Sequence, residues 1–104
     1  MGTTIRAQIS EKNKYYIDKH RHYELKHFCL QYPNWKKARY SKRVELIEQV
    51  AKDADKYLWQ YILKAVTEGL SYTYLRTKLD IPCGKDMYYD RYRRFFWLLS
   101  EVRD

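Results

Sequence analysis

The chain has 104 residues, a formal net charge of +8 and 45% hydrophobic residues, many of them aromatic. This length supports one domain, residues 1–104, and three glycines and two prolines are too few for a many-stranded β fold. No stretch approaches the roughly 20 apolar residues that cross a bilayer, and two cysteines cannot build a disulfide framework. Composition therefore predicts an all-α cytoplasmic protein and argues against a membrane protein.

The positive charge is concentrated in the N-terminal half. Residues 1–43 hold eleven Lys or Arg and three Asp or Glu, whereas residues 44–104 hold ten of each kind. Basic proteins attract polyanions. Any surface for such a partner is therefore expected mainly in residues 10–43, which should form a basic helix and a connector.

The first predicted helix covers residues 10–32, with Ser10 as its N-cap. Pro33 should end it, because proline lacks an N–H and disfavours helical geometry in the residue before it. Residues 34–43 are basic and aromatic and predict a connector. Its cations either contact phosphate or are solvated, and the aromatic residues of this half either stack on bases or pack in the core.

The second predicted helix, residues 43–68, has the clearest pattern. Apolar residues recur every three or four positions and therefore share one helix face. They are Val44, Ile47, Ala51, Ala54, Leu58, Ile62 and Ala65. A break near Asp53 to Asp55 is the alternative, and Gly69 should end the helix in a left-handed conformation.

Two further helices, residues 72–79 and 85–102, complete a compact bundle of about four helices. Ser71 should cap the first of them. Cys83 stands where a Ser or Thr usually caps the last helix. The expected core stripe of that helix is Tyr88, Tyr92, Phe95, Leu99 and Val102. Trp97 lies on the opposite side, where the first helix should cover it; contact with a second copy in a homodimer is the alternative.

No set of residues predicts catalysis, a metal or a cofactor. His20 and His27 share a helix face while His22 points elsewhere, and two ligands do not close a metal site. Asp53 and Asp55 diverge on a helix, so they do not form an acid–base pair. The sequence therefore predicts a binding protein and not an enzyme.

The C-terminal segment has the rhythm of a helix-turn-helix, in which a short helix and a tight turn precede a recognition helix. Residues 69–71 (Gly-Leu-Ser) and 79–82 (Leu-Asp-Ile-Pro) resemble region 4 of sigma factors. With residues 87–94 (Met-Tyr-Tyr-Asp-Arg-Tyr-Arg-Arg), the chain resembles RinA/ArpU-type transcriptional regulators of phages and prophages. Similar sequences hold an insert after the counterpart of Lys37, which this chain lacks.

The resemblance implies a sequence-specific DNA-binding regulator whose recognition helix, about residues 85–95, reads duplex DNA in the major groove. The expected base contacts are Lys85, Asp86, Tyr89, Asp90 and Arg93. The expected contacts to the DNA backbone are Lys36, Lys37, Arg39, Lys42, Arg43 and Arg94. Two carboxylates among the base contacts weaken the attraction to phosphate. Contact with a protein such as RNA polymerase, or a role in DNA packaging, therefore stays open.

Overall fold

The computed structural model describes residues 13–39 and 41–103, and within these ranges the chain forms helices and turns without strands. The helices are α1 (Lys19–Leu30), α2 (Tyr32–Lys37), α3 (Ser41–Ala54), α4 (Trp59–Glu68), α5 (Tyr72–Lys78) and α6 (Lys85–Val102). The all-α class is confirmed. The described residues hold six helices where about four were predicted, and none of these helices is long and apolar enough to span a membrane.

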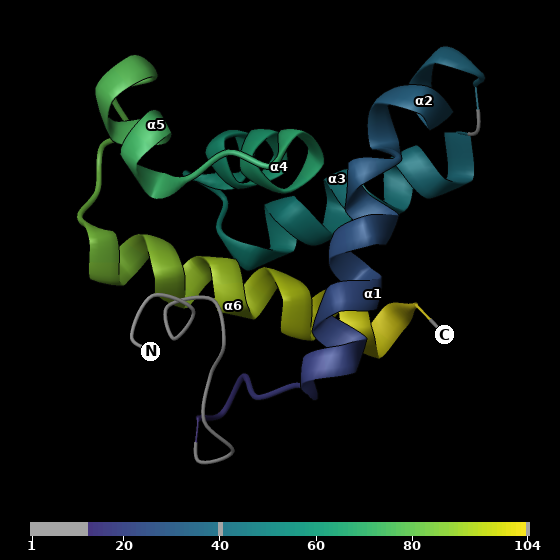
Figure 1. The fold of residues 1–104 in the computed structure, drawn as a ribbon, viewed down its shortest axis with the longest axis horizontal. Coiled ribbons are helices and arrows are strands. Elements are labelled where there is room, and N and C mark those ends of the chain that lie inside the picture. The colour runs from purple at the N-terminus through teal and green to yellow at the C-terminus, as the bar shows by residue number, and fades with distance from the viewer. Residues whose placement is uncertain (1–12, 40, 104) are drawn as a thin grey trace.

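The helices pack around α3, which contacts both α4 and α6, and α1 packs on α4 and α6 (Figure 1). Helix α6 runs along one side of the molecule, and α1 crosses its C-terminal half. The longest axis of the molecule measures 38 Å. In Figure 1, α5 and the start of α6 lie at one end of this axis, whereas α2 and the start of α3 lie at the other.

The apolar stripe predicted for residues 43–68 faces the core. Ile47, Ala51 and Ile62 are fully buried, in one cluster with Leu25 of α1. The stripe predicted for α6 is likewise buried or half-buried as far as Leu99. Val102 is a correction, because it lies in the last turn of α6 and remains 57% exposed on the rim of an open groove.

The first predicted helix is shorter than expected, and the connector is largely helical. Helix α1 begins after Asp18, whose carboxylate accepts a bond of 2.9 Å from the His20 N–H. The proposed cap Ser10 lies outside the described residues. Pro33 does not end helical structure, because it occupies the first turn of α2, where the missing N–H has no helical partner to lose.

The predicted helix 43–68 is two helices, and the break lies where the alternative placed it. Helix α3 ends at Ala54, and α4 begins at Trp59. Between them, the Asp55 carboxylate accepts bonds of 2.8 Å from the N–H groups of Tyr57 and Leu58. These bonds close the turn that leads from α3 into α4.

One prediction about the last helix needs correction, and another holds in part. Cys83 is not the cap, because α6 begins after Gly84 and no side chain of the described residues caps it. The Cys83 carbonyl instead accepts a bond of 2.8 Å from the Tyr72 hydroxyl, which ties the turn to α5. Trp97 is half-buried against Tyr15, with ring centroids 5.8 Å apart. The segment predicted as the first helix therefore covers Trp97 as expected, but Tyr15 lies before α1 and is not helical.

Candidate nucleic-acid interface

The start of α5 is fixed by the two local signals expected from the sequence. Gly69 ends α4 in the left-handed region, with a φ of 70°, where a side chain would be strained. The Ser71 side chain then accepts a bond of 3.1 Å from the Tyr74 N–H. These residues set the direction in which α5 leaves α4.

The turn between α5 and α6 is closed by backbone bonds and by one buried side chain. The Leu75 carbonyl accepts from the N–H groups of Leu79 and Ile81, at 3.2 and 3.1 Å. Asp80 adopts a left-handed φ of 55°, which aspartate tolerates better than most residues. Ile81 is fully buried. The turn is therefore held at both ends, and it fixes where α6 begins.

The first turn of α6 is exposed. Lys85, Asp86 and Met87 all face solvent, and Met87 is 46% exposed. Asp86 lies in the first turn, where a carboxylate also interacts favourably with the helix dipole. Two of the predicted base-contacting residues, Lys85 and Asp86, are thus brought together on an accessible helix start.

Tyr89, another predicted base contact, is half-buried in an aromatic cluster. Its ring centroid lies 6.4 Å from that of Tyr72, 5.1 Å from that of Tyr88 and 6.0 Å from that of Tyr92. Tyr88 is 1% exposed, and burial raises the pKa of its hydroxyl. This cluster joins α5 to α6, so Tyr89 supports the helix as well as reaching its surface.

The remaining predicted base contacts lie one turn further along α6. Asp90 and Arg93 are both half-buried. Asp90 forms an ion pair with Arg91, which also pairs with Asp55 at 2.8 Å. The accessible part of the predicted site is therefore the first turn, and residues 90–93 lie closer to the body of the molecule.

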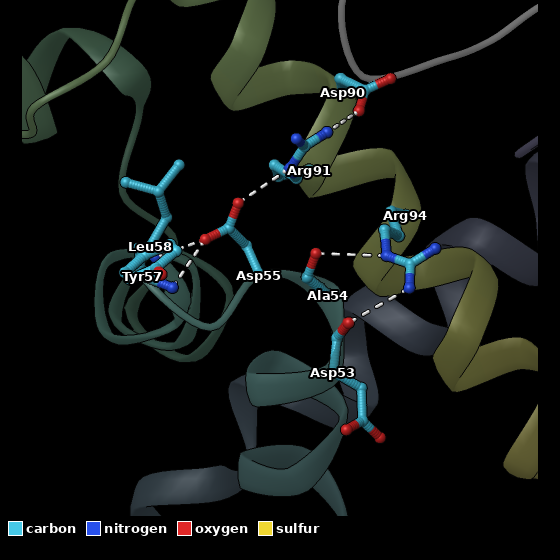
Figure 2. A network of polar contacts seen from close by, with 8 residues as sticks. All are labelled: Asp53, Ala54, Asp55, Tyr57, Leu58, Asp90, Arg91 and Arg94. Atoms are coloured by element: carbon cyan, nitrogen blue, oxygen red, sulfur yellow. Dashed lines mark hydrogen bonds and ion pairs between the residues drawn. The ribbon is translucent and has the colours of Figure 1, made fainter.

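Arg91 links α6 to the corner between α3 and α4 (Figure 2). Its Nε bonds to one oxygen of Asp55, while the other oxygen holds the start of α4. Burial opposes ionisation of Asp55, but the Leu58 N–H and then Arg91 and the Tyr57 N–H outweigh it and lower the pKa of that carboxyl. One buried carboxylate therefore holds three elements together.

Arg94, predicted to contact the DNA backbone, bonds within the fold (Figure 2). Its Nε donates to the Ala54 carbonyl at 3.2 Å, and its Nη2 donates to the Asp53 carbonyl at 3.3 Å. These are carbonyls at the end of α3, where a cation also opposes the negative end of the helix dipole. A phosphate contact by Arg94 stays a prediction.

The other predicted phosphate contacts gather where α2 meets α3. We call this group the basic corner. It consists of Lys36, Lys37, Arg39, Lys42 and Arg43. All five are exposed, and no acidic residue occurs between positions 36 and 43. The structure thus brings these five cations to one end of the molecule, away from the start of α6.

Aromatic rings support two cations of the basic corner. The Lys36 ammonium lies 5.6 Å from the centre of the Tyr32 ring, and the Arg43 guanidinium lies 5.0 Å from that of Trp35. Both rings belong to the buried core. Tyr32 also donates a short hydrogen bond to Glu48, and burial, together with that carboxylate, raises the pKa of its hydroxyl. These cation–π contacts position the Lys36 and Arg43 side chains without neutralising their charge.

Among the described residues, no cluster of three or more His, Cys, Asp or Glu could hold a metal ion. Burial raises the pKa of the Cys29 thiol to about 12, and it also raises that of Cys83. Both thiols therefore stay protonated near neutral pH, and neither is an activated nucleophile.

Sequence reasoning did not identify Asp55 and Arg91 as a pair. The proposed break near Asp55 was the one available indication, because an aspartate side chain in a turn commonly accepts a bond from a backbone N–H two residues further along the chain. Its partner lies 36 residues further along the chain, and no local pattern connects the two.

No family model, curated protein or solved structure matches this chain.

Proposed function

We propose that this protein binds duplex DNA and that the first turn of α6 enters the major groove. The proposal is carried by the exposure of Lys85, Asp86 and Met87 at the start of a helix that follows a closed turn. Helix-turn-helix proteins present the N-terminal residues of the recognition helix to base edges. Lysine donates to guanine, and a carboxylate accepts from the cytosine amino group.

The basic corner would supply the affinity. Contacts to phosphate give binding strength without sequence preference, whereas contacts to bases give selectivity. The first turn of α6 carries Lys85 and Asp86, whose charges cancel, so it attracts phosphate weakly. The five cations of the basic corner fill that role in the proposal.

Sequence reading by a small helical protein fits the regulation of transcription in a phage, prophage or mobile element. The resemblance of residues 69–71 and 79–82 to sigma-factor region 4, and of residues 87–94 to RinA/ArpU-type regulators, supports this role. A regulator of this kind acts in the cytoplasm. It needs no catalytic group and no cofactor.

A protein partner at the same end of the molecule is the second candidate. Tyr57 is 78% exposed and Met87 is 46% exposed, and both line one open groove beside Arg91. Exposed apolar side chains that lie together often mark a protein contact. RNA polymerase, a packaging protein or a second copy of the chain would then bind here in place of DNA.

A titration of labelled random-sequence duplex at about 50 and about 200 mM salt separates the two candidates. If about five phosphates are neutralised, affinity should fall at least about a hundredfold between these conditions. A protein that contacts only other proteins would bind no duplex even at the lower salt. That result would refute the proposal.

Sequence reading is tested on a duplex selected from a random pool. Lys85→Ala with Asp86→Ala should remove the preference for the selected duplex over a random one, and Tyr89→Ala with Arg93→Ala should act in the same direction. Lys36→Ala with Lys37→Ala, the matched control, should weaken binding to both duplexes by similar factors. If only the control pair changes binding, α6 does not read the sequence.

A further inference from the structure

The two surfaces of the proposed DNA contact lie at opposite ends of the molecule. Helix α2 and the first turn of α3, which carry the basic corner, occupy one end of the 38 Å axis, and the first turn of α6 occupies the other (Figure 1). One short stretch of phosphates cannot reach both ends. The separation therefore bears on how much DNA one molecule contacts.

Several charged side chains outside the basic corner are paired within the protein. On α4, Lys64 and Glu68 form an ion pair of 3.0 Å, and at the end of α5, Arg76 pairs with Asp80 at 3.3 Å. Such exposed pairs present little net charge to a polyanion. The basic corner differs from these pairs, because its five cations follow one another in the sequence without an acidic residue, and we expect attraction to phosphate to be strongest there.

The spacing matches the repeat of the duplex. B-form DNA presents the same groove on the same face once per helical turn, about 34–36 Å or 10–10.5 base pairs. Two protein surfaces at the ends of a 38 Å axis can thus meet equivalent positions on adjacent turns. A cationic contact on one turn would then hold a nearly neutral helix start over the groove of the next.

We propose that one molecule contacts a single duplex at two places about one helical turn apart, with the start of α6 in the major groove and the basic corner on phosphates of the adjacent turn. This inference rests on the proposed DNA binding. It implies that the duplex must have a minimum length to contact both surfaces at once, because a duplex much shorter than one turn reaches only one of them.

Lysine protection tests this spacing in the full chain. The protein is mixed with random-sequence duplexes of about 8 or about 20 base pairs, and exposed lysines are acetylated and quantified by mass spectrometry. Lys85 reports on the start of α6, and Lys36 and Lys37 report on the basic corner. Lys19, exposed at the start of α1, is the internal control and should react equally in every sample.

We expect one equivalent of the long duplex to protect Lys85, Lys36 and Lys37 together. One equivalent of the short duplex should protect Lys36 and Lys37 while Lys85 stays reactive. In parallel, Lys36→Ala with Lys37→Ala should lower the salt slope on the long duplex by about 2, because each lysine releases about one counterion.

Two other results would overturn the inference and leave DNA binding intact. In the first, one short duplex protects all three lysines at once, which would mean that the two surfaces contact one local stretch. In the second, the long duplex binds but protects only one of the two groups. If neither duplex binds nor protects any lysine, the proposed function fails together with the inference.

Discussion

The two ends of the molecule handle charge in different ways. At the basic corner, Lys36 and Arg43 lie over the rings of Tyr32 and Trp35, and no acidic residue interrupts the five cations. At the α5–α6 end, Arg76 and Arg91 are paired with the carboxylates of Asp80 and Asp90, and hydrogen bonds close the turn. The basic corner would thus supply attraction to phosphate, and the α5–α6 end would supply the shape that enters a groove. Substitutions at the two ends should therefore affect different properties of DNA binding.

The corner between α3 and α4 connects these two ends. Arg91 and Arg94 of α6 bond to Asp55 and to the last carbonyls of α3 (Figure 2). Because α3 begins at the basic corner, these bonds fix the start of α6 relative to it. Two arginines that look like surface charges in the sequence thus set the distance between the two ends.

The largest expected effect comes from breaking this connection. Asp55→Ala removes the acceptor for the N–H groups of Tyr57 and Leu58 in the turn before α4, and it leaves Arg91 without its Asp55 partner. We expect the free energy of unfolding to fall by about 2–3 kcal/mol, because loss of the charged hydrogen bond to Arg91 alone costs about 1.5–3 kcal/mol. Urea denaturation measures the loss.

Asp53→Ala is the matched control for that variant. Within residues 13–39 and 41–103, the Asp53 carboxylate accepts a bond only from Gln49, in an exposed contact of 3.0 Å, and Arg94 binds the Asp53 backbone carbonyl, which alanine retains. The unfolding free energy should change by less than about 0.5 kcal/mol. Equal losses in the two aspartate variants would show that the Asp55 network does not stabilise the fold.

The next effect concerns the cap of α5, which sets the direction of the turn before α6. Ser71→Ala removes the acceptor for the Tyr74 N–H and should lower the free energy of unfolding by about 1 kcal/mol. Thr73→Ala, on the exposed side of the same helix, should have little effect. Thermal unfolding of both variants measures the difference. A Ser71→Ala variant as stable as the unmodified protein would contradict the assigned cap.

The smallest effect is a pH dependence near neutrality. His22 is buried against Phe96, with ring centroids 4.8 Å apart, and burial together with the Lys26 charge lowers the pKa of its imidazole to about 4. The folded protein therefore keeps His22 neutral, whereas in the unfolded chain His22 gains a proton when the pH falls below its ordinary pKa of 6.5. Stability should fall as the pH drops below 6.5, and this loss should be complete near pH 4.

Between pH 7 and pH 6 this loss should stay below about 1 kcal/mol. His22→Phe should flatten the dependence, because phenylalanine carries no group that titrates in this range. Unfolding curves at several pH values provide the measurement. If the stability of His22→Phe depends on pH as that of the unmodified protein does, a group other than His22 is responsible for the dependence.

Local signals predicted the C-terminal half of the fold well. The bounds of α6, the left-handed Gly69 and the Ser71 cap all follow from residues close together in the sequence. The apolar stripe from Val44 to Ala65 was equally clear, because helical spacing places these residues on one face. Lys85 and Asp86 were chosen from the resemblance to sigma-factor region 4, and the structure shows that both are exposed.

Long-range contacts account for most of what the sequence did not predict. The apolar stripe continues across the break after Ala54, so periodicity alone could not distinguish one helix from two, and the Arg91 bond to Asp55 spans 36 residues. Pro33 was misinterpreted because proline both ends helices and begins them. Whether Pro33 ends one helix or begins the next depends on the direction that the chain takes after α1.

DNA reading by α6 can be tested by NMR, with backbone amide shifts followed while a duplex of about 20 base pairs is added. We expect the shifts to concentrate in two separate groups, residues 72–78 with 84–90 and residues 35–43. Little change is expected in the buried middle of α3. Shifts confined to α1, or absent from the first turn of α6, would contradict DNA reading by that helix.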